Sequence, residues 1–278
     1  MTRRRVTAAH VARLAETLSA RELAVVATLD RVRVATAGQL RRLHFTAGTE
    51  RANARQAQRR LRVLVERRVL AELDRQIGGT GGGSAQAIYA LDVAGQRLGE
   101  MLGPAGGRRL RRPWTPGLPF LAHTLDVTEL YVRLREWEHG GGELLAFDAE
   151  PACWRRFSGL GGARTWLKPD AFVRTAAGDF EHVSFVEVDR DTASLPGIAR
   201  RLGVYARYLQ TDASRETRRY GVFPRLVLLA PDAPRRDALA DVVAAGPSEL
   251  RTVAVAHRFA DALSVLAGDA PDTPLTGA

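Results

Sequence analysis

A chain of 278 residues is long enough for two domains of ordinary size. Hydrophobic residues make up 45% of it, which is typical of a globular protein and excludes a largely disordered one. No apolar run approaches the roughly 18–20 residues that cross a bilayer, and the first residues lack the apolar core of a secretory signal. The single cysteine, Cys153, excludes an intramolecular disulfide and a cysteine-cluster zinc site. We therefore expect a cytoplasmic protein without a membrane partner.

The positive charge is concentrated in the first two-fifths of the chain. Residues 1–112 hold 22 arginines and 9 acidic residues, a balance of +13, whereas residues 113–278 have a balance of −3. An arginine-rich composition of the kind that a GC-rich genome produces explains the choice of arginine over lysine. It does not explain why the surplus lies at one end. The asymmetry predicts a polyanion-binding half joined to a half with another task.

The first half has the element order of a winged helix-turn-helix. Apolar periodicity predicts three helices and then two short strands joined by a glycine-rich segment, with a further helix to close the domain. Thr36 is the expected N-cap of the second helix. In chain order we expect helices at 21–33, 37–43 and 51–68, strands at 70–73 and 87–91 around the glycines of 77–84, and a helix at 93–102. This domain is predicted to span residues 1–102.

Residues 103–119 combine glycine, proline and four arginines without periodicity, which predicts an interdomain linker. The rest of the chain, 120–278, alternates helical and strand-like segments. Its predicted helices are 120–138, 195–210, 234–245 and 259–267, and its predicted strands are 143–148, 165–174, 182–189, 225–230 and 251–256. This order predicts an α/β sandwich in which the early strands pair as a meander, so the whole chain is of the mixed α/β (α+β) class.

The predicted third helix carries apolar side chains on one side and arginines on the other. With about 100° per residue, Ala54 and its apolar neighbours (Ala57, Leu61, Leu64, Val65) fall on one face of the helix. Guanidinium groups and an amide on the remaining surface could contact phosphates and base edges in a DNA major groove. The candidate DNA-binding residues are Arg51, Arg55, Gln56, Arg59, Arg62, Arg67 and, beyond the helix, Arg75. The alternative is a solvated basic face. An RNA target is less favoured because this half has no aromatic stacking surface.

Three carboxylates of the second half form the other candidate site. In the segment 182–190, Glu187 and Asp189 lie on the same side of a strand as Val183 and Phe185. Val186 and Val188 lie on the opposite side, so both faces carry apolar residues. A strand that is apolar on both faces is expected in the centre of its sheet. Asp170, at the preceding strand, could converge with the two acids. Carboxylate oxygens of this kind suit Mg²⁺ or Mn²⁺, which could activate water for attack on a phosphodiester.

Asp170 followed by Glu187-x-Asp189 resembles the PD-(D/E)xK arrangement of restriction-endonuclease-like domains. More specifically, a winged helix ahead of LKPDAFV, FVEVDRDT and ARRLGVYARYL resembles the replication-relaxation family of bacterial plasmids and integrated mobile elements. The resemblance covers about residues 21–230. It implies a DNA-binding protein that assists the replication or transfer of its element, with a nuclease-like second domain.

The sequence departs from the nuclease pattern where the lysine is usual, because Asp189 stands at that position. The basic role could have moved to Lys168, the only lysine, or to Arg200 or Arg201 in the following helix. We therefore take Asp170, Glu187 and Asp189 as candidate metal ligands, and these with Lys168 and Arg201 as candidate catalytic residues. The alternative is an inert cluster in which the three acids pair with Arg174, Arg190 and Arg201. Asp191 or Thr192 is expected to cap the next helix.

Two functions remain open at this point. The first is a DNA-binding accessory protein of a plasmid or mobile element, with double-stranded DNA as its partner and a degenerate or weakly active nuclease-like domain. The second is a Mg²⁺- or Mn²⁺-dependent endonuclease that its winged helix targets to one locus. Winged helices often bind palindromes as dimers, so a homodimer is expected, and replication or transfer proteins are candidate partners.

Overall fold

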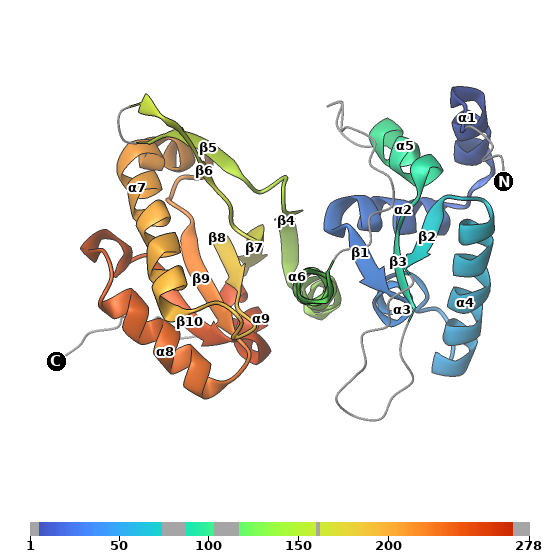
Figure 1. Cartoon of the computed structure of the whole chain (residues 1–278). Coiled ribbons are helices and arrows are strands. Elements are labelled where there is room, and N and C mark those ends of the chain that lie inside the picture. The colour runs from blue at the N-terminus through green and yellow to red at the C-terminus, as the bar shows by residue number, and fades with distance from the viewer. Residues whose placement is uncertain (1–5, 74–86, 103–116, 160–161, 269–278) are drawn as a thin grey trace. The chain divides into compact units, whose positions relative to one another are not determined.

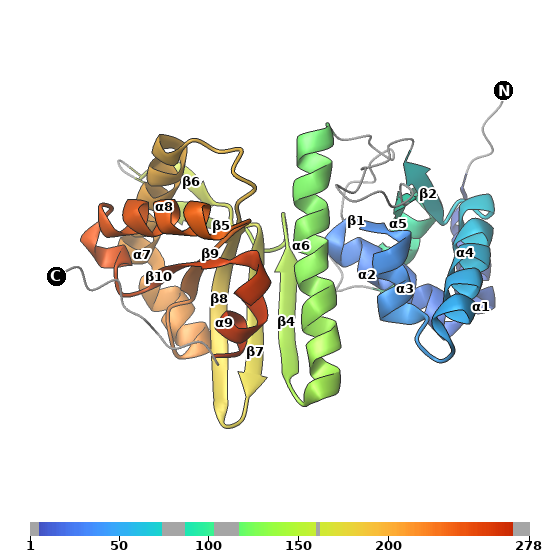
Figure 2. The same cartoon turned by 90° about the horizontal axis from the view of Figure 1, so that it is seen from below.

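The computed structural model describes residues 6–73, 87–102, 117–159 and 162–268. They form two compact units, residues 1–132 and 133–278 (Figure 1 and Figure 2). The predicted α+β class is confirmed, because helices occur together with parallel and antiparallel strands. The glycine-rich segment 77–84 and most of the predicted linker lie outside the described residues. In the part of the chain that is described, no helix is both long and apolar enough to cross a bilayer.

The first unit consists of helices around a small antiparallel sheet. Its helices are α1 (Ala8–Thr17), α2 (Ala20–Val32), α3 (Ala37–His44), α4 (Glu50–Glu66), α5 (Val93–Leu102) and the greater part of α6 (Leu118–Trp137). Its strands are β1 (Val34–Thr36), β2 (Leu70–Leu73) and β3 (Ile88–Leu91), in the order β1-β3-β2. The predicted helices and strands of this half are therefore present, with ends shifted by one or two residues.

Local hydrogen bonds explain where the early helices begin. Ser19 and Glu22 form a capping box at the start of α2. Thr36 caps α3, as predicted, and Gln39 completes a second capping box. No strand was predicted between the first two predicted helices, and this was wrong. Val34–Thr36 form β1, which pairs with β3 in an antiparallel register that the local sequence could not reveal.

One face of α4 packs into the hydrophobic core of the first unit. Its buried residues are Asn53, Ala57, Leu61 and Leu64, whereas Ala54, which was expected on this face, is exposed. Asn53 takes that place because it is bonded to the turn before the helix. Its side chain accepts a hydrogen bond from the Gly48 N–H (3.1 Å) and donates one to the Gly48 carbonyl (2.9 Å). These bonds fix the turn between α3 and α4.

Helix α6 begins two residues earlier than predicted, and its first turns belong to the first unit. Thr128 donates a hydrogen bond to the Val34 carbonyl (2.8 Å), and Leu125 packs against the small sheet. The compact units divide between Val132 and Arg133, inside this helix. The domain and linker boundaries predicted from the sequence, at 102/103 and 119/120, stay predictions.

The second unit is built on a five-stranded sheet. The sheet has the order β10-β9-β8-β7-β4, in which β8, β9 and β10 are parallel and β4, β7 and β8 form the predicted antiparallel meander. Its strands are β4 (Glu143–Ala149), β7 (Ala171–Ala177), β8 (Phe180–Val188), β9 (Arg225–Ala230) and β10 (Ala254–Arg258). The predicted central strand is β8, the third of the five.

Helices cover both faces of this sheet. Helices α7 (Leu195–Tyr220) and α8 (Ala233–Ala244) pack against Phe185, Leu226 and Leu228 on one face. The short helix α9 (Ala262–Ala267) contacts β7 and β8 on the other face (Figure 2). Its Leu266 carbonyl accepts a hydrogen bond from Thr175 (2.5 Å). The unit also contains the short 3₁₀ helices η1 (Glu138–Gly140), η3 (Ser248–Leu250) and η4 (Phe259–Asp261).

The single strand predicted at 165–174 was wrong. Two strands occur there, because the chain leaves one sheet and enters another around Lys168–Asp170. The first, β6 (Arg164–Leu167), pairs only with β5 (Arg155–Ser158) in a separate two-stranded sheet, and the second is β7. Asp170 therefore lies immediately before β7 rather than within a strand.

Candidate functional site

The exposed side of α4 carries a row of arginines directly opposite its core face. With about 100° per residue, Arg51, Arg55, Arg59 and Arg62 fall within an arc of about 80° on the helix surface. The centre of this arc lies about 160° from the centre of the buried face. All four side chains are exposed, and none forms an ion pair with an acid of the described residues. We call these four residues the arginine face.

The remaining DNA-binding candidates do not join the arginine face. Gln56 is half-buried on another side of α4, and Arg67 is the C-cap residue, exposed on that same other side. Arg75 lies outside the described residues. The neighbouring Arg60 points toward Glu22, at 3.8 Å, so its charge is partly balanced within the unit. Four of the predicted residues therefore share one exposed side of α4.

In the second unit, Glu187 lies on β8 beneath α7 and is almost completely buried, with 2% of its surface exposed. One carboxylate oxygen accepts a hydrogen bond from the Tyr205 hydroxyl (2.7 Å), and the other is paired with the Arg201 guanidinium (2.5 Å). Both partners project from α7. Arg201 was predicted as a partner of this acid cluster, whereas Tyr205 was not among the predicted site residues.

Burial and charge act in opposite directions on Glu187. Removal from water raises the pKa of its carboxyl group, and the nearby negative charge of Asp170 raises it further. The guanidinium of Arg201 and the hydroxyl of Tyr205 lower the pKa, but they do not outweigh the burial. The carboxyl group of Glu187 therefore holds its proton to a higher pH than an ordinary glutamate does.

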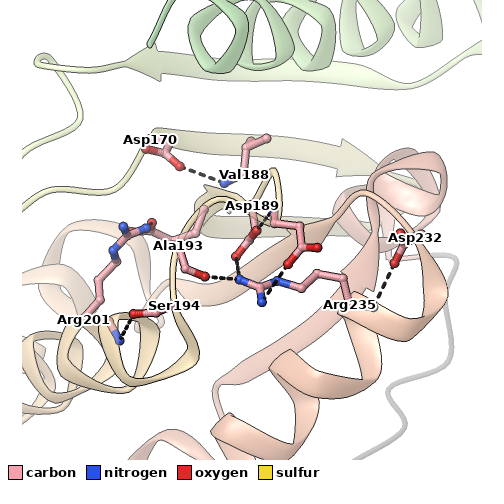
Figure 3. A network of polar contacts seen from close by, with 11 residues as sticks. Asp170, Val188, Asp189, Ala193, Ser194, Arg201, Asp232 and Arg235 are labelled. Atoms are coloured by element: carbon pink, nitrogen blue, oxygen red, sulfur yellow. Dashed lines mark hydrogen bonds and ion pairs between the residues drawn. The ribbon is translucent and has the colours of Figure 1, made fainter. Parts of the chain in front are cut away.

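Asp189 has a different partner, Arg235 of α8 (Figure 3). The Arg235 guanidinium donates to Asp189 at 2.9 Å and to the Ala193 carbonyl at 2.6 Å, and it also pairs with Asp191 at 2.9 Å. The backbone N–H of Asp191 donates to the second oxygen of Asp189. Arg235 thus fastens the loop between β8 and α7 to the start of α8. The actual N-cap of α7 is Ser194, so the expected caps Asp191 and Thr192 were wrong.

Asp170 completes the edge of the β7–β8 ladder. Its backbone N–H donates to the Val186 carbonyl (3.0 Å), and its carboxylate accepts from the Val188 N–H (2.8 Å; Figure 3). The Asp170 carboxylate thus takes the place of a backbone carbonyl as acceptor for Val188, the last residue of β8. Lys168 is exposed, and its ammonium group lies 4.7 Å from the centre of the Trp154 ring.

Ion pairs and hydrogen bonds hold all three candidate metal ligands. Glu187 is paired with Arg201 and Asp189 with Arg235. The Asp170 carboxylate accepts a hydrogen bond from the Val188 N–H, and its negative charge also acts on Glu187 and Arg201. Within the described residues, no group of three or more histidine, cysteine, aspartate or glutamate side chains has an arrangement that could hold a metal ion. A divalent cation bound to Glu187 or Asp189 would have to displace an arginine from that carboxylate.

The inert salt-bridge alternative named the wrong partners in part. Arg201 pairs with Glu187 as that alternative expected, but Arg174 pairs with Glu181 instead. Arg235 was missed altogether. It lies 46 residues from Asp189, and no local pattern connects the two positions. Only the parallel crossover through α7 and β9 brings the start of α8 to the end of β8.

A scan against protein-family models matches residues 26–226 of the chain to the family described as replication-relaxation. No curated protein matches the chain, and no solved structure does. The matched segment runs from α2 to β9, so it includes both the arginine face and the three carboxylates.

Replacement of Arg235 tests its role as the cation that balances Asp189. The side chains of Arg235 and Asp189 are only 10% and 4% exposed, so Arg235→Ala leaves a buried carboxylate without its ion pair. We expect the free energy of unfolding, measured with denaturant, to fall by about 3 kcal/mol or more. Arg236→Ala removes a surface pair with Asp237 and should cost less than about 1 kcal/mol. The assignment fails if both variants lose the same free energy of unfolding, or if adding Asp189→Ala to Arg235→Ala restores none of the lost free energy.

The raised pKa of Glu187 predicts the pH dependence of stability. Above pH 4.5, the ordinary value for a glutamate, the folded state holds the Glu187 proton more tightly than the unfolded state does. The contribution of Glu187 to the free energy of unfolding should therefore decrease as the pH rises from 4.5 toward neutrality. Denaturation curves of the wild type and Glu187→Gln over this range isolate the effect, because Arg201 stays charged throughout. If the contribution of Glu187 to the free energy of unfolding increases with pH, the charge of Arg201 affects the pKa of Glu187 more strongly than burial does.

Proposed function

Since the chain belongs to the replication-relaxation family, we propose that it is a DNA-binding accessory protein in the replication or transfer of a plasmid or integrated mobile element. Membership of this family suggests a role in the replication or relaxation of such elements. The proposal adds that the first unit binds double-stranded DNA as a winged helix and that α4 enters the major groove.

The observation that carries this proposal is the arginine face. Four exposed guanidinium groups on a helix of 17 residues, without acidic partners in the described part of the chain, are a strong electrostatic attraction for a polyanion. A guanidinium group can also donate two hydrogen bonds to a guanine edge. The order α2, α3, α4 followed by β2 and β3 is the order of a winged helix, in which the third helix recognises DNA.

The geometry of the turn before α4 supports the same role. A recognition helix must keep a fixed orientation relative to the rest of its domain if its side chains are to meet particular bases. The two hydrogen bonds between Asn53 and Gly48, together with Thr49 as N-cap, hold the start of α4 in one orientation. The arginine face is thus presented by a rigid element.

The second unit is proposed to have a nuclease-like fold in which the carboxylates serve structure. The partners of Glu187 and Asp189 support this proposal, because Arg201 and Arg235 supply the positive charge that a metal ion would otherwise bring. A metal site made by Asp170, Glu187 and Asp189, with Lys168 or Arg201 as a catalytic partner, remains the alternative. A homodimer likewise stays a prediction.

Substitution of two members of the arginine face tests the DNA-binding role. We expect Arg55→Ala with Arg59→Ala to weaken binding at least about tenfold, because each lost base contact costs roughly 1–3 kcal/mol. The probe is a short duplex that the wild-type protein selects from a randomised pool, and the measurement is a band shift. Arg13→Ala with Arg251→Ala, which removes two exposed arginines elsewhere, is the charge-matched control. Equal losses in the two double variants would contradict recognition by α4.

Incubation with supercoiled plasmid separates the two functions. If the carboxylates are structural, the plasmid stays supercoiled in Mg²⁺ and in Mn²⁺, whereas the selected duplex is still shifted on a gel. Conversion to the nicked form by the wild type, with no conversion by Asp170→Ala, would contradict the binder and establish the endonuclease.

A further inference from the structure

The hairpin formed by β5 and β6 stands apart from the main sheet of the second unit and has two unlike faces (Figure 1). The register places Arg156 opposite Trp166 and Ser158 opposite Arg164. Because side chains alternate along a strand, these four residues share one face. All four are exposed. We call this the outer face of the hairpin.

The opposite face of the hairpin anchors it to the second unit. Phe157 and Leu167 are buried in the core cluster that includes α7. Arg155, also buried, donates to Glu216 of α7 at 2.9 Å and to the Cys153 carbonyl at 2.8 Å. Its guanidinium lies 4.7 Å from the centre of the Phe172 ring. The outer face is therefore held by a buried, hydrogen-bonded support and not by a loose loop.

The outer face presents an aromatic ring that the protein itself does not cover. Trp166 is 48% exposed, although tryptophan is usually largely buried. It meets Trp154 at a centroid distance of 6.3 Å and an interplanar angle of 66°, so the two rings are not stacked face to face. Lys168, which directly follows β6, places its ammonium group 4.7 Å from the centre of the Trp154 ring. Aromatic rings and cations thus alternate along this surface.

The charge of this surface is entirely positive. The segment 151–169 contains no acid, and its exposed basic residues are Arg156, Arg164 and Lys168. Neither Arg156 nor Arg164 forms an ion pair with an acid of the described residues. Arg215 of α7 donates to the Arg156 carbonyl at 3.2 Å, which brings a further guanidinium to the edge of the hairpin. A ligand that matches this surface must offer negative charge and flat aromatic groups together.

We propose that the outer face of the β5–β6 hairpin binds single-stranded DNA. An unpaired base stacks on Trp166, and the neighbouring phosphates are held by Arg156 and Arg164. Stacking on exposed aromatic rings between cations is how proteins bind single strands with little regard to sequence. A paired base offers only its edges, so a duplex could use the arginines but not the indole. The inference goes beyond the proposed duplex recognition by α4 and does not rest on it.

The test uses the full-length chain and a fluorescent oligo(dT), which forms no duplex. Anisotropy measures its affinity for the wild type and for Trp166→Ala. We expect Trp166→Ala to bind about tenfold more weakly or worse, because loss of one stacked base contact costs that much. Phe180→Ala is the matched control. The Phe180 ring is even more exposed, at 72%, but its neighbours in the chain are the acids Asp179 and Glu181. Loss of this ring should leave the affinity for oligo(dT) unchanged.

A second variant keeps the test decisive if Trp166→Ala loses its fold by circular dichroism. Arg164→Ala changes only an exposed side chain, and it should also weaken oligo(dT) binding. Arg55→Ala with Arg59→Ala should leave it intact, which separates this site from α4. The proposal is overturned if the wild type does not bind oligo(dT), if both hairpin variants bind it normally, or if the α4 variant alone abolishes binding. A preference for oligo(U) over oligo(dT) would overturn the assignment to DNA.

Discussion

The burial of one side of α4 in the core of the first unit determines which of its side chains can meet a ligand. Ala57, Leu61 and Leu64 point inward, and the helical repeat then turns the arginine face outward. The polar Asn53 on the buried side is tolerated because Gly48 satisfies its amide. The packing of one side of α4 in the core therefore also determines that the arginine face is exposed, and the proposed function of the first unit rests on that exposure.

In the second unit, acidic side chains lie near the end of a central strand. Glu187 is paired with Arg201 of α7, Asp189 is paired with Arg235 of α8, and Asp170 accepts a hydrogen bond from the Val188 N–H. A buried carboxylate without such a partner would be costly. The three acids that the sequence analysis took as candidate metal ligands thus form internal ion pairs and hydrogen bonds.

The sequence predicted most elements because their signals are local, such as the cap at Thr36 and the apolar periodicity of α4. It also placed β8 correctly in the centre, since both faces of that strand are apolar. It could not predict β1, which is defined only by its pairing with β3, nor the change of sheet at Asp170. Arg235 was missed for the same reason, because its contact with Asp189 depends on the tertiary path of the chain.

In the proposed function, the arginine face binds phosphates and bases of duplex DNA. The most direct test is the salt dependence of duplex affinity for the wild type and for Arg51→Ala, followed over a series of salt concentrations. If the arginine face contacts phosphates, the logarithm of the binding constant falls linearly with the logarithm of the salt concentration. The slope should become shallower by about one when one phosphate contact is lost. An affinity indifferent to salt, or a slope that Arg51→Ala leaves unchanged, would contradict it.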